Sequence, residues 1–367
     1  MKIAIMGTRG VPANYGGFET FAEELGQRLV KKGHQVTVYC RRGFGEKVES
    51  PLEYKGIKRV ILPAPHHKYF ETVVHTFFSL LHVIFHKVDV IILCNAANSP
   101  VAWLAKIARI PVLINVDGIE RRRKKWNFLG RLWYRLGEFC SVLFATKIIS
   151  DADVIADYYK NRFKTDSVVI RYGAEASIDW DINLLKDFDL TSGKYWLYVA
   201  RLEPENNALG VIEAYKSSNS KIPLVIVGDA PYAREYKQQL KERSKGCNVI
   251  FTGYQFGVPY KTLGANCYAY IQASEVGGTH PALVEAMARG NCILANDVPE
   301  HREVIGDAGL LYNFNDFKIL AEKMDFLENN FELVQTKREE ARRRASELFS
   351  WNSITEKYES LCSEVIK

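Results

Sequence analysis

The stretch Ile271–Gly290, IQASEVGGTHPALVEAMARG, contains the end of an apolar strand, a glycine loop and the start of a helix. Pro281 suits the first position of this helix, where a backbone N–H is not needed. The amides of Gly277, Gly278 and Thr279 precede it and would face an anion held at the helix N-terminus. Such a strand–loop–helix unit is typical of a doubly wound α/β sheet.

The same alternation extends along the chain in both directions from this stretch. Helical patterns at Phe18–Lys32, Ser99–Ala108 and Asp151–Asn161 separate apolar runs, which predicts parallel sheets covered on both faces. The expected strands are Lys2–Met6, Gln35–Cys40, Ile57–Leu62, Val88–Leu93, Val112–Ile114, Lys147–Ile149, Ser167–Ile170, Tyr195–Ala200, Leu224–Val227, Val249–Phe251, Cys267–Ile271 and Cys292–Ala295.

The alternation pauses at Arg171–Lys194, a polar and turn-rich segment that we interpret as a domain linker. We therefore expect two doubly wound Rossmann-like α/β domains, at residues 1–172 and 173–350. A C-terminal helix at 351–367 is expected to pack back on the first domain. Ligands of such sheets bind beyond the carboxyl ends of the strands, so the site is expected in a cleft between the domains.

Composition excludes several classes of protein. The 367 residues are 47% hydrophobic and 25% charged, which is ordinary for a globular protein of two domains. The net charge of +6 is too small to indicate a nucleic-acid partner. Seven cysteines without a CxxC pair indicate free thiols in a reducing cytoplasm and no zinc site.

The most apolar region, Thr72–Cys94, contains charged residues and so has no uncharged span long enough to cross a membrane. His82 and His86 in this region are four residues apart, but no Glu lies between them as in HExxH, which favours an ordinary helix surface over a metal site.

A second glycine loop follows the first expected strand, in GTRGVPANYGGFET at residues 7–20. Its spacing is not GxGxxG, which argues against a nicotinamide dinucleotide enzyme. Gly16 and Gly17 can present N–H groups to an anion at the next helix, where Glu19 suits the helix dipole. A flexible surface turn is the alternative.

The second half carries residues suited to a nucleoside diphosphate. Arg201, in YVARLEPENNALGVIEAY, can neutralise phosphates. Glu285 lies one turn into the helix that begins at Pro281, so its carboxylate can accept hydrogen bonds from two neighbouring ribose hydroxyls. His280 is interpreted as a neighbour of the helix cap rather than a general base.

Four motifs occur in order: GTRGVPANYGGFET, NVDGIERRRKKWN, ARLEPENN and EVGGTHPALVEAMA. With SDADVIADYYKNRF and FSWNSITEKYES, they make the chain resemble the family 4 glycosyltransferases of GT-B fold over essentially its whole length. Within that family they resemble a bacterial subgroup that includes rhamnosyltransferases of capsule and cell-wall polysaccharide assembly.

Two positions depart from the family pattern. The family usually has Lys five residues after this Arg, where Asn206 stands here. Its Glu-x7-Glu motif would require Glu at Gly277, whereas the upstream glutamate is Glu275. Either a loop insertion returns Glu275 to the sugar, or the loop amides take over its role.

The resemblance implies a retaining transfer without metal or other cofactor, in which the leaving phosphate accepts the acceptor's proton. The implied donor is dTDP-L-rhamnose, and the implied acceptor is an undecaprenyl-diphosphate-linked saccharide. Asp117 follows a strand and is a candidate acceptor-side residue or a loop cap. The candidates are Glu275, Asp117 and Arg201 for catalysis, Gly16, Gly17, Arg201, Gly277, Gly278, Thr279 and Glu285 for the donor, and Asn95, Asn98 and Asp117 for the acceptor.

The Asp-x-Asp pattern, which can bind a metal ion, occurs at Asp151–Asp153, Asp179–Asp181 and Asp187–Asp189. Asp151 follows a strand and opens a helix, so helix capping is its expected role. An NDP-sugar epimerase of similar architecture, or a non-catalytic partner of other glycan-assembly proteins, are the alternative functions.

The segment Arg121–Arg135, RRRKKWNFLGRLWYR, interleaves basic residues with aromatic ones. Basic residues beside interfacial aromatics suit an anionic membrane surface. We therefore expect a cytoplasmic protein that lies peripherally on the inner face of the plasma membrane, with core packing of the aromatics as the alternative. The apolar side chains involved are Trp126, Phe128, Trp133 and Tyr134, with Phe77, Phe78, Leu81 and Phe85 from an expected helix at Tyr69–His86.

Overall fold

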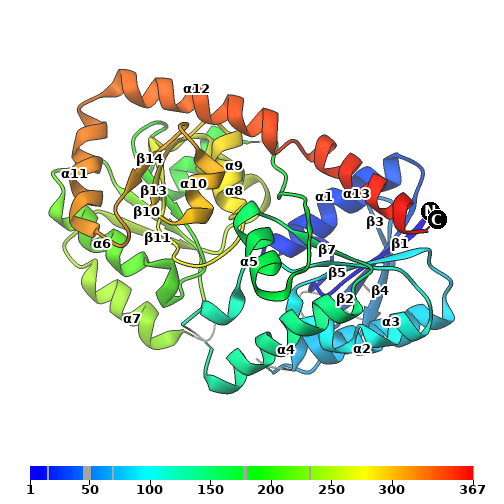
Figure 1. Ribbon diagram of the computed structural model, residues 1–367. Helices are drawn as coiled ribbons and strands as arrows, with labels where there is room; N and C mark the ends of the chain where they lie inside the picture. The colour runs from blue at the N-terminus through cyan, green and yellow to red at the C-terminus, as the bar shows by residue number, and fades with distance from the viewer. Residues whose placement is uncertain are drawn as a thin grey trace. The chain divides into compact units, whose positions relative to one another are not determined.

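The computed structural model describes residues 1–14, 16–43, 51–67, 70–124, 126–176, 180–230 and 233–366. Tyr69 and Asp179, which are named above, lie outside these ranges, as does Lys125 of the segment Arg121–Arg135. The chain forms two compact units (Figure 1). The first comprises residues 1–122, 126–172 and 351–367, and the second comprises Arg123, Lys124 and residues 173–350.

The first unit contains a sheet in the order β3-β4-β2-β1-β5-β6-β7-β8. Every neighbouring pair is parallel except β3 and β4. The strands are β1 (Lys2–Met6), β2 (Gln35–Arg41), β3 (Glu53–Tyr54), β4 (Ile57–Leu62), β5 (Val90–Cys94), β6 (Val112–Asn115), β7 (Lys147–Ser150) and β8 (Val168–Val169).

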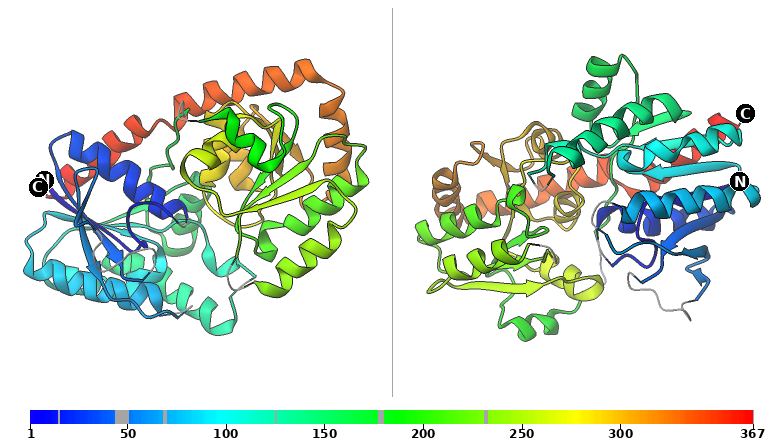
Figure 2. Two further views of the ribbon diagram at one scale, coloured as in Figure 1. Left: turned by 180° about the vertical axis from the view of Figure 1, so that it is seen from behind. Right: turned by 90° about the horizontal axis from the view of Figure 1, so that it is seen from below.

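Helices cover both faces of this sheet (Figure 2). Ile3 and Ile5 of β1 pack in one core with helices α1 and α13, whereas Ala4 and Met6 pack in another with α2, α3 and α5. This alternation follows from the two-residue period of a strand. The helices are α1 (Gly17–Lys31), α2 (Glu71–Phe85), α3 (Trp103–Ile107), α4 (Phe128–Phe144), α5 (Asp153–Phe163) and α13 (Trp351–Ile366), with 3-10 turns η1 (Ala96–Val101) and η2 (Glu120–Arg122).

The second unit contains a fully parallel sheet in the order β11-β10-β9-β12-β13-β14. Its strands are β9 (Trp196–Val199), β10 (Leu224–Val227), β11 (Val249–Gly253), β12 (Ala269–Gln272), β13 (Cys292–Asn296) and β14 (Leu310–Tyr312). The expectation of two doubly wound α/β domains is therefore confirmed.

Two cores lie on the two faces of the second sheet, with Trp196 and Tyr198 in one and Leu197 in the other. The helices that complete these cores and their connections are η3 (Ile182–Phe188), η4 (Pro204–Asn206), α6 (Ala208–Ser217), α7 (Arg234–Arg243), α8 (Gly257–Ala265), α9 (Pro281–Ala288), α10 (Pro299–Ile305), α11 (Phe317–Glu328) and α12 (Phe331–Leu348).

Two predicted elements are wrong in detail. Ser99–Ala108 is not one helix, because Pro100 lies inside η1 and a separate short helix, α3, follows. The expected linker Arg171–Lys194 is not merely a connection, because it contains η3 and buries Leu185 and Leu190 in a core of the second unit.

No helix in the described ranges is both long and apolar enough to span a bilayer. All seven cysteines are free thiols, and six of them are buried.

Candidate active site

The strand order of the second sheet reverses between β9 and its neighbour β12. At such a switch point the loops at the carboxyl ends of the two strands diverge, which opens a ligand site. Arg201 follows β9, and Gly277, Gly278 and Thr279 follow β12. The backbone N–H of Glu275 donates a 2.9 Å hydrogen bond to the carbonyl of Glu205, so the two loops are joined.

The glycine loop is buried and leads directly into α9, which begins at Pro281 as predicted. A Cβ atom at Gly277 would lie 2.4 Å from Cε1 of His280. The imidazole therefore occupies the space that a side chain at 277 would need. This contact gives a physical reason why glycine stands where the family pattern has Glu.

His280 and His301 pack together beside this loop, with ring centroids 4.7 Å apart. The Nδ1–H of His301 donates to the Asn296 carbonyl at 2.8 Å. Burial lowers the pKa of His301 to about 4. Burial also lowers the pKa of His280 well below its usual range, with smaller contributions from His301 and Arg123. Both rings are therefore neutral near pH 7 and do not add positive charge to the loop.

Glu285 lies on α9, and its carboxylate is held by two side chains that sequence reasoning missed. The Tyr260 hydroxyl donates to Oε2 at 2.6 Å, and Nη2 of Arg289 lies 3.4 Å from the same oxygen. Burial raises the pKa of Tyr260, so the phenol stays protonated and donates. The four-residue spacing of Glu285 and Arg289 on a helix was a readable signal, whereas nothing in the sequence pointed to Tyr260.

The Glu275 side chain is only 11% exposed, and its Oε1 lies at two polar groups. Asn315 Nδ2 donates to it at 2.9 Å, and Lys124 Nζ, which belongs to the same unit, is also 2.9 Å away. Asn315 is itself held by Asn296 through bonds of 2.8 and 2.9 Å. Asn296 and Asn315, which sequence reasoning missed, therefore fix the Glu275 carboxylate near the carboxyl ends of β13 and β14.

Asn206 has a structural role in the loop after β9. Its Nδ2 donates to the Arg201 carbonyl at 2.7 Å, and its own carbonyl accepts from the Tyr198 hydroxyl at 2.6 Å. Asn206 therefore closes the loop without contributing the cation that the family pattern has at this position. Arg201 is half-buried immediately after the strand.

The first sheet has its own switch point, between β1 and β5. Gly16 is the N-cap of α1 and Gly17 begins the helix. Glu19 is buried and accepts from the backbone N–H of Arg9 at 2.7 Å, and burial raises its pKa. Its carboxylate thus fixes the glycine loop after β1.

The two candidate asparagines after β5 make contacts that shape this loop. Asn95 Oδ1 accepts from the N–H of Ala97 at 2.9 Å. Asn98 is fully buried, and its Nδ2 donates to the Cys94 carbonyl at 2.8 Å while its Oδ1 accepts from the Thr72 hydroxyl at 3.0 Å.

Asp117 follows β6 in the left-handed region, with φ of 58°. Aspartate tolerates this conformation better than most residues. Its backbone N–H donates to Oδ1 of Asn115 at 3.1 Å. The side chain that accepts from this loop amide is therefore Asn115, and Asp117 is half-buried beside it.

A buried charge cluster near the first glycine loop was not predicted. Glu71, at the start of α2, pairs with Arg9 at 2.9 Å and also with Arg41 at the end of β2. Arg41 Nη2 donates to the Thr72 hydroxyl at 2.7 Å. These residues are far apart in the sequence, which explains why no local pattern revealed them.

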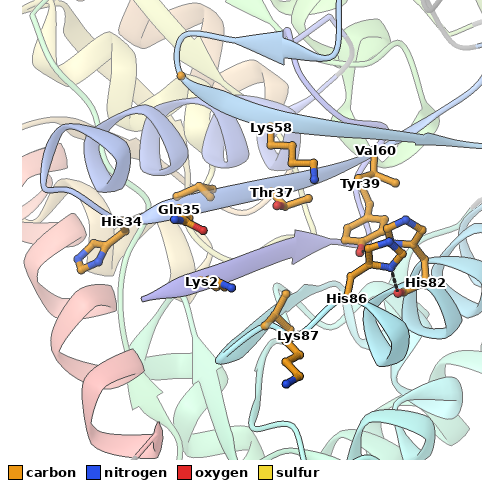
Figure 3. A pocket seen from close by; sticks show the side chains of 13 residues that line it. Lys2, His34, Gln35, Thr37, Tyr39, Lys58, Val60, His82, His86 and Lys87 are labelled. Atoms are coloured by element: carbon orange, nitrogen blue, oxygen red, sulfur yellow. Dashed lines mark hydrogen bonds between the residues drawn. The ribbon is translucent and has the colours of Figure 1, made fainter.

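A surface groove of about 480 Å³ in the first unit is lined by Lys2, Lys58, Lys87, Tyr39, His82 and His86, among others (Figure 3). Lys2 begins β1 and Lys87 precedes β5, so the groove reaches the amino ends of these strands. Ligands of doubly wound sheets bind at the opposite, carboxyl ends. The groove is therefore not the candidate active site.

The described residues include no cluster of three His, Cys, Asp or Glu able to hold a metal ion. The His82 and His86 rings are stacked 3.8 Å apart. Asp153 pairs with Arg171 at 2.6 Å. The helix α5 begins at Asp153 with Ala152 at the N-cap, one residue after Asp151, and the capping role expected for Asp151 stays a prediction.

Comparison with known proteins finds a family model that matches each half of the chain. Residues 186–344 match the family described as Glycosyl transferases group 1, and residues 1–175 match a domain of unknown function, DUF1972. The O-antigen chain mannosyltransferase C of Escherichia coli is 22% identical over 97% of this chain and 96% of its own length. The mannosyltransferase B of the same organism is 26% identical, but the match covers only 47% of this chain and 46% of that protein.

Solved structures share the whole fold. HepE of Anabaena, solved with UDP and glucose, has a TM-score of 0.81 at 18% identity and covers 99% of this chain and 100% of its own. Sucrose-phosphate synthase of Thermosynechococcus elongatus has a TM-score of 0.84 at 18% identity, covering 99% and 98%. The protein therefore has the GT-B fold, and its residues 186–344 match the glycosyl transferases group 1 family.

Proposed function

We propose that this protein is a retaining glycosyltransferase that moves a sugar from a nucleotide sugar onto a lipid-linked saccharide in bacterial surface polysaccharide assembly. The observation that carries the proposal is the switch point of the second sheet. There, Arg201, the Gly277–Thr279 loop and Glu285 lie on the loops and the helix that follow β9 and β12. Two O-antigen chain mannosyltransferases among its relatives, and a GT-B neighbour solved with UDP and glucose, support this class of reaction.

In this proposal the donor's diphosphate lies at the N-terminus of α9. The amides of Gly277, Gly278 and Thr279 and the guanidinium of Arg201 stabilise the charge that develops on the leaving group. The ribose lies at Glu285. The Gly16–Gly17 amides of the first unit are the second proposed donor contact.

The chemical step is a front-face substitution. The bond between the anomeric carbon and the diphosphate oxygen breaks while the acceptor hydroxyl oxygen bonds to the same face of that carbon. The hydroxyl proton passes to the leaving phosphate oxygen. Glu275 is proposed to stabilise the oxocarbenium-like sugar, since Asn315 holds its carboxylate in place. Asp117 is proposed to orient a hydroxyl on the acceptor side, with Asn95 and Asn98 shaping the adjacent loop.

The proposed donor is dTDP-L-rhamnose, because four sequence motifs resemble those of bacterial rhamnosyltransferases. The named activity of the E. coli relatives favours a second candidate, a mannose donor. L-rhamnose is 6-deoxy-L-mannose, so the two sugars share the same ring hydroxyl pattern in mirror-image form. Transfer assays that compare dTDP-rhamnose, GDP-mannose and UDP-glucose on one lipid-linked acceptor decide between them.

We also propose that the first unit lies on an anionic membrane surface, and support comes from α4. Six large apolar side chains on this helix are exposed, including Phe128 at 77% and Phe139 at 53%. From Leu129 onward their spacing of three or four residues places them along one face, and Phe128 lies four residues before Leu132. They are Phe128, Leu129, Leu132, Leu136, Phe139 and Leu143.

Charge on the same segment suits a bilayer better than a protein core. Residues 121–137 contain seven Lys or Arg and no Asp or Glu. Arg131 and Arg135 are exposed and border the apolar stripe. An amphipathic helix with basic residues beside exposed apolar ones is typical of contact with anionic lipid.

The membrane contact expected from sequence needs a correction. Tyr134 is buried, and Trp133 Nε1 donates to the Ala97 carbonyl at 3.0 Å, so these aromatics pack within the unit. Arg121 is bound to Glu138 and Tyr158, each at 2.9 Å. The leucines and phenylalanines of α4 with Arg131 and Arg135 are the better candidates, joined by Phe78 and Phe85 of α2, which are exposed.

A further inference from the structure

The carboxylate of Glu285 is used asymmetrically. Within the described residues, its polar contacts fall on one oxygen, Oε2, which accepts from the Tyr260 hydroxyl at 2.6 Å and lies 3.4 Å from Arg289 Nη2. An oxygen that already has two donors has little remaining capacity to accept a third hydrogen bond. The ligand-accepting capacity of Glu285 is therefore concentrated on Oε1.

This arrangement is held rigidly between α8 and α9. The Arg289 side chain is only 7% exposed, and its guanidinium lies 4.6 Å from the centroid of the Tyr260 ring. Gly264 of α8 leaves room for the Arg289 guanidinium, since a Cβ there would lie 2.9 Å from Nη1. Tyr260 and Arg289 therefore cannot easily leave Oε2 when a ligand binds.

We propose that Tyr260 is a specificity-determining residue, because it occupies the oxygen that would otherwise bind a second ribose hydroxyl. A carboxylate binds two neighbouring hydroxyls best when each of its oxygens accepts a hydrogen bond from one of them. With Oε2 occupied, Glu285 binds a single hydroxyl of the nucleotide, and the 2′-hydroxyl contributes little. The site therefore takes 2′-deoxyribonucleoside diphosphates as readily as ribonucleoside diphosphates. This inference rests on the proposed function, which places the ribose at Glu285.

The experiment compares nucleotides that differ only in the 2′-hydroxyl, namely UDP with dUDP and GDP with dGDP. Dissociation constants are measured by calorimetry on the full chain. For the unaltered protein we expect each pair to agree within about threefold, less than the effect of one full hydrogen bond to a charged group. In Tyr260→Phe, Oε2 becomes available to the second ribose hydroxyl. The ribonucleotide should then bind about 10-fold more tightly than its 2′-deoxy partner.

Tyr195→Phe is the matched control. The Tyr195 hydroxyl is also buried and donates at 2.7 Å to the carbonyl of Leu263 in α8, but it does not contact Glu285. In Tyr195→Phe, the ratio of the dissociation constants for each nucleotide pair should stay at the value of the unaltered protein. Thermal melting of both variants checks that the second unit remains folded.

Two results would overturn the inference while leaving the proposed site in place. One is binding of the ribonucleotide more than about 10-fold tighter than that of its 2′-deoxy partner in the unaltered protein. The other is an equal loss of affinity for both members of each pair in Tyr260→Phe, which would make Tyr260 a structural support only. Glu285→Gln tests the site itself: unchanged affinity for all four nucleotides would remove the ribose from Glu285 and so contradict the proposed function.

Discussion

Asn315 holds Glu275: its Nδ2 donates a 2.9 Å hydrogen bond to the Glu275 carboxylate. Asn315 is bonded in turn to Asn296, the last residue of β13. A residue of the loop after β14 thus fixes the carboxylate proposed to face the donor sugar. This support does not involve the proposed nucleotide contacts, so the two functions of the site can be separated by substitution.

Asn315→Ala should lower kcat by about 10-fold, because Glu275 loses a hydrogen bond to its charged form. The dissociation constant for the nucleoside diphosphate should change by less than about twofold, since Asn315 is not among the proposed nucleotide contacts. Steady-state transfer and calorimetry measure the two quantities. An equal loss of kcat and of nucleotide affinity would argue that Asn315 supports the whole loop rather than Glu275.

Glu285→Gln should lower transfer by about 100-fold or more, on the scale of losing charge-assisted hydrogen bonds to the ribose. Glu213→Gln is a suitable control, because Glu213 is in the same unit and pairs with exposed Arg243. Near-full activity of Glu285→Gln, with unchanged nucleotide affinity, would show that the ribose is bound elsewhere.

Stability should rise with pH between about 4 and 6.5 because of His301. Its pKa falls to about 4 in the folded state from 6.5, so the unfolded state binds more protons in this range, and the free energy of unfolding decreases as pH falls. His301→Asn should make the melting temperature less dependent on pH between about 4 and 6.5 than it is in the unaltered protein. His75, whose pKa burial lowers to about 3, and His280, whose pKa burial lowers well below its usual range, remain in the variant and contribute the residual slope. Identical pH profiles for both proteins would exclude His301 as the cause.

Binding to vesicles of anionic lipid should depend on α4. Replacing Leu132, Leu136 and Phe139 with Ser should abolish flotation with such vesicles, because the exposed apolar stripe is lost. Arg131→Ser with Arg135→Ser should weaken binding, and salt should weaken it in the unaltered protein. Arg243→Ser, an exposed arginine of the second unit, is the control. Undiminished flotation of the triple variant would place any membrane contact elsewhere.

Transfer should survive excess EDTA, since the proposed stabilisation of the diphosphate uses loop amides and Arg201. The assay is transfer to the same acceptor with and without chelator. Complete loss of transfer that Mg²⁺ or Mn²⁺ restores would require a metal at the diphosphate.

The sheets were readable from the sequence because their strands are buried and apolar. β1, β4 and β10 have the predicted bounds, and β10, for example, is an uninterrupted apolar run between Pro223 and Gly228. The α4 helix was missed for the opposite reason. Its buried face includes Gly130, Gly137, Glu138 and Ser141, while its leucines are exposed, so its polarity does not follow the usual rule of apolar residues inside.

The parts of the candidate site that depend on distant contacts were not readable. Tyr260 and Glu285 come from different helices, and only packing brings them to 2.6 Å. The glycine at 277 was visible as a departure from a motif, but its physical reason, the His280 imidazole, required the structure. Local motifs therefore located the site, and tertiary contacts supplied its supporting residues.

The most direct test of the proposed function is transfer of a radiolabelled sugar to a lipid-linked saccharide, measured for the unaltered protein and for Glu285→Gln. The donors are dTDP-rhamnose, GDP-mannose and UDP-glucose. We expect transfer with retention of anomeric configuration, the highest rate with dTDP-rhamnose, and a loss of about 100-fold in the variant. Preference for GDP-mannose would reassign the donor, and absence of transfer from every donor, or inversion at the anomeric carbon, would contradict the proposed retaining glycosyltransferase.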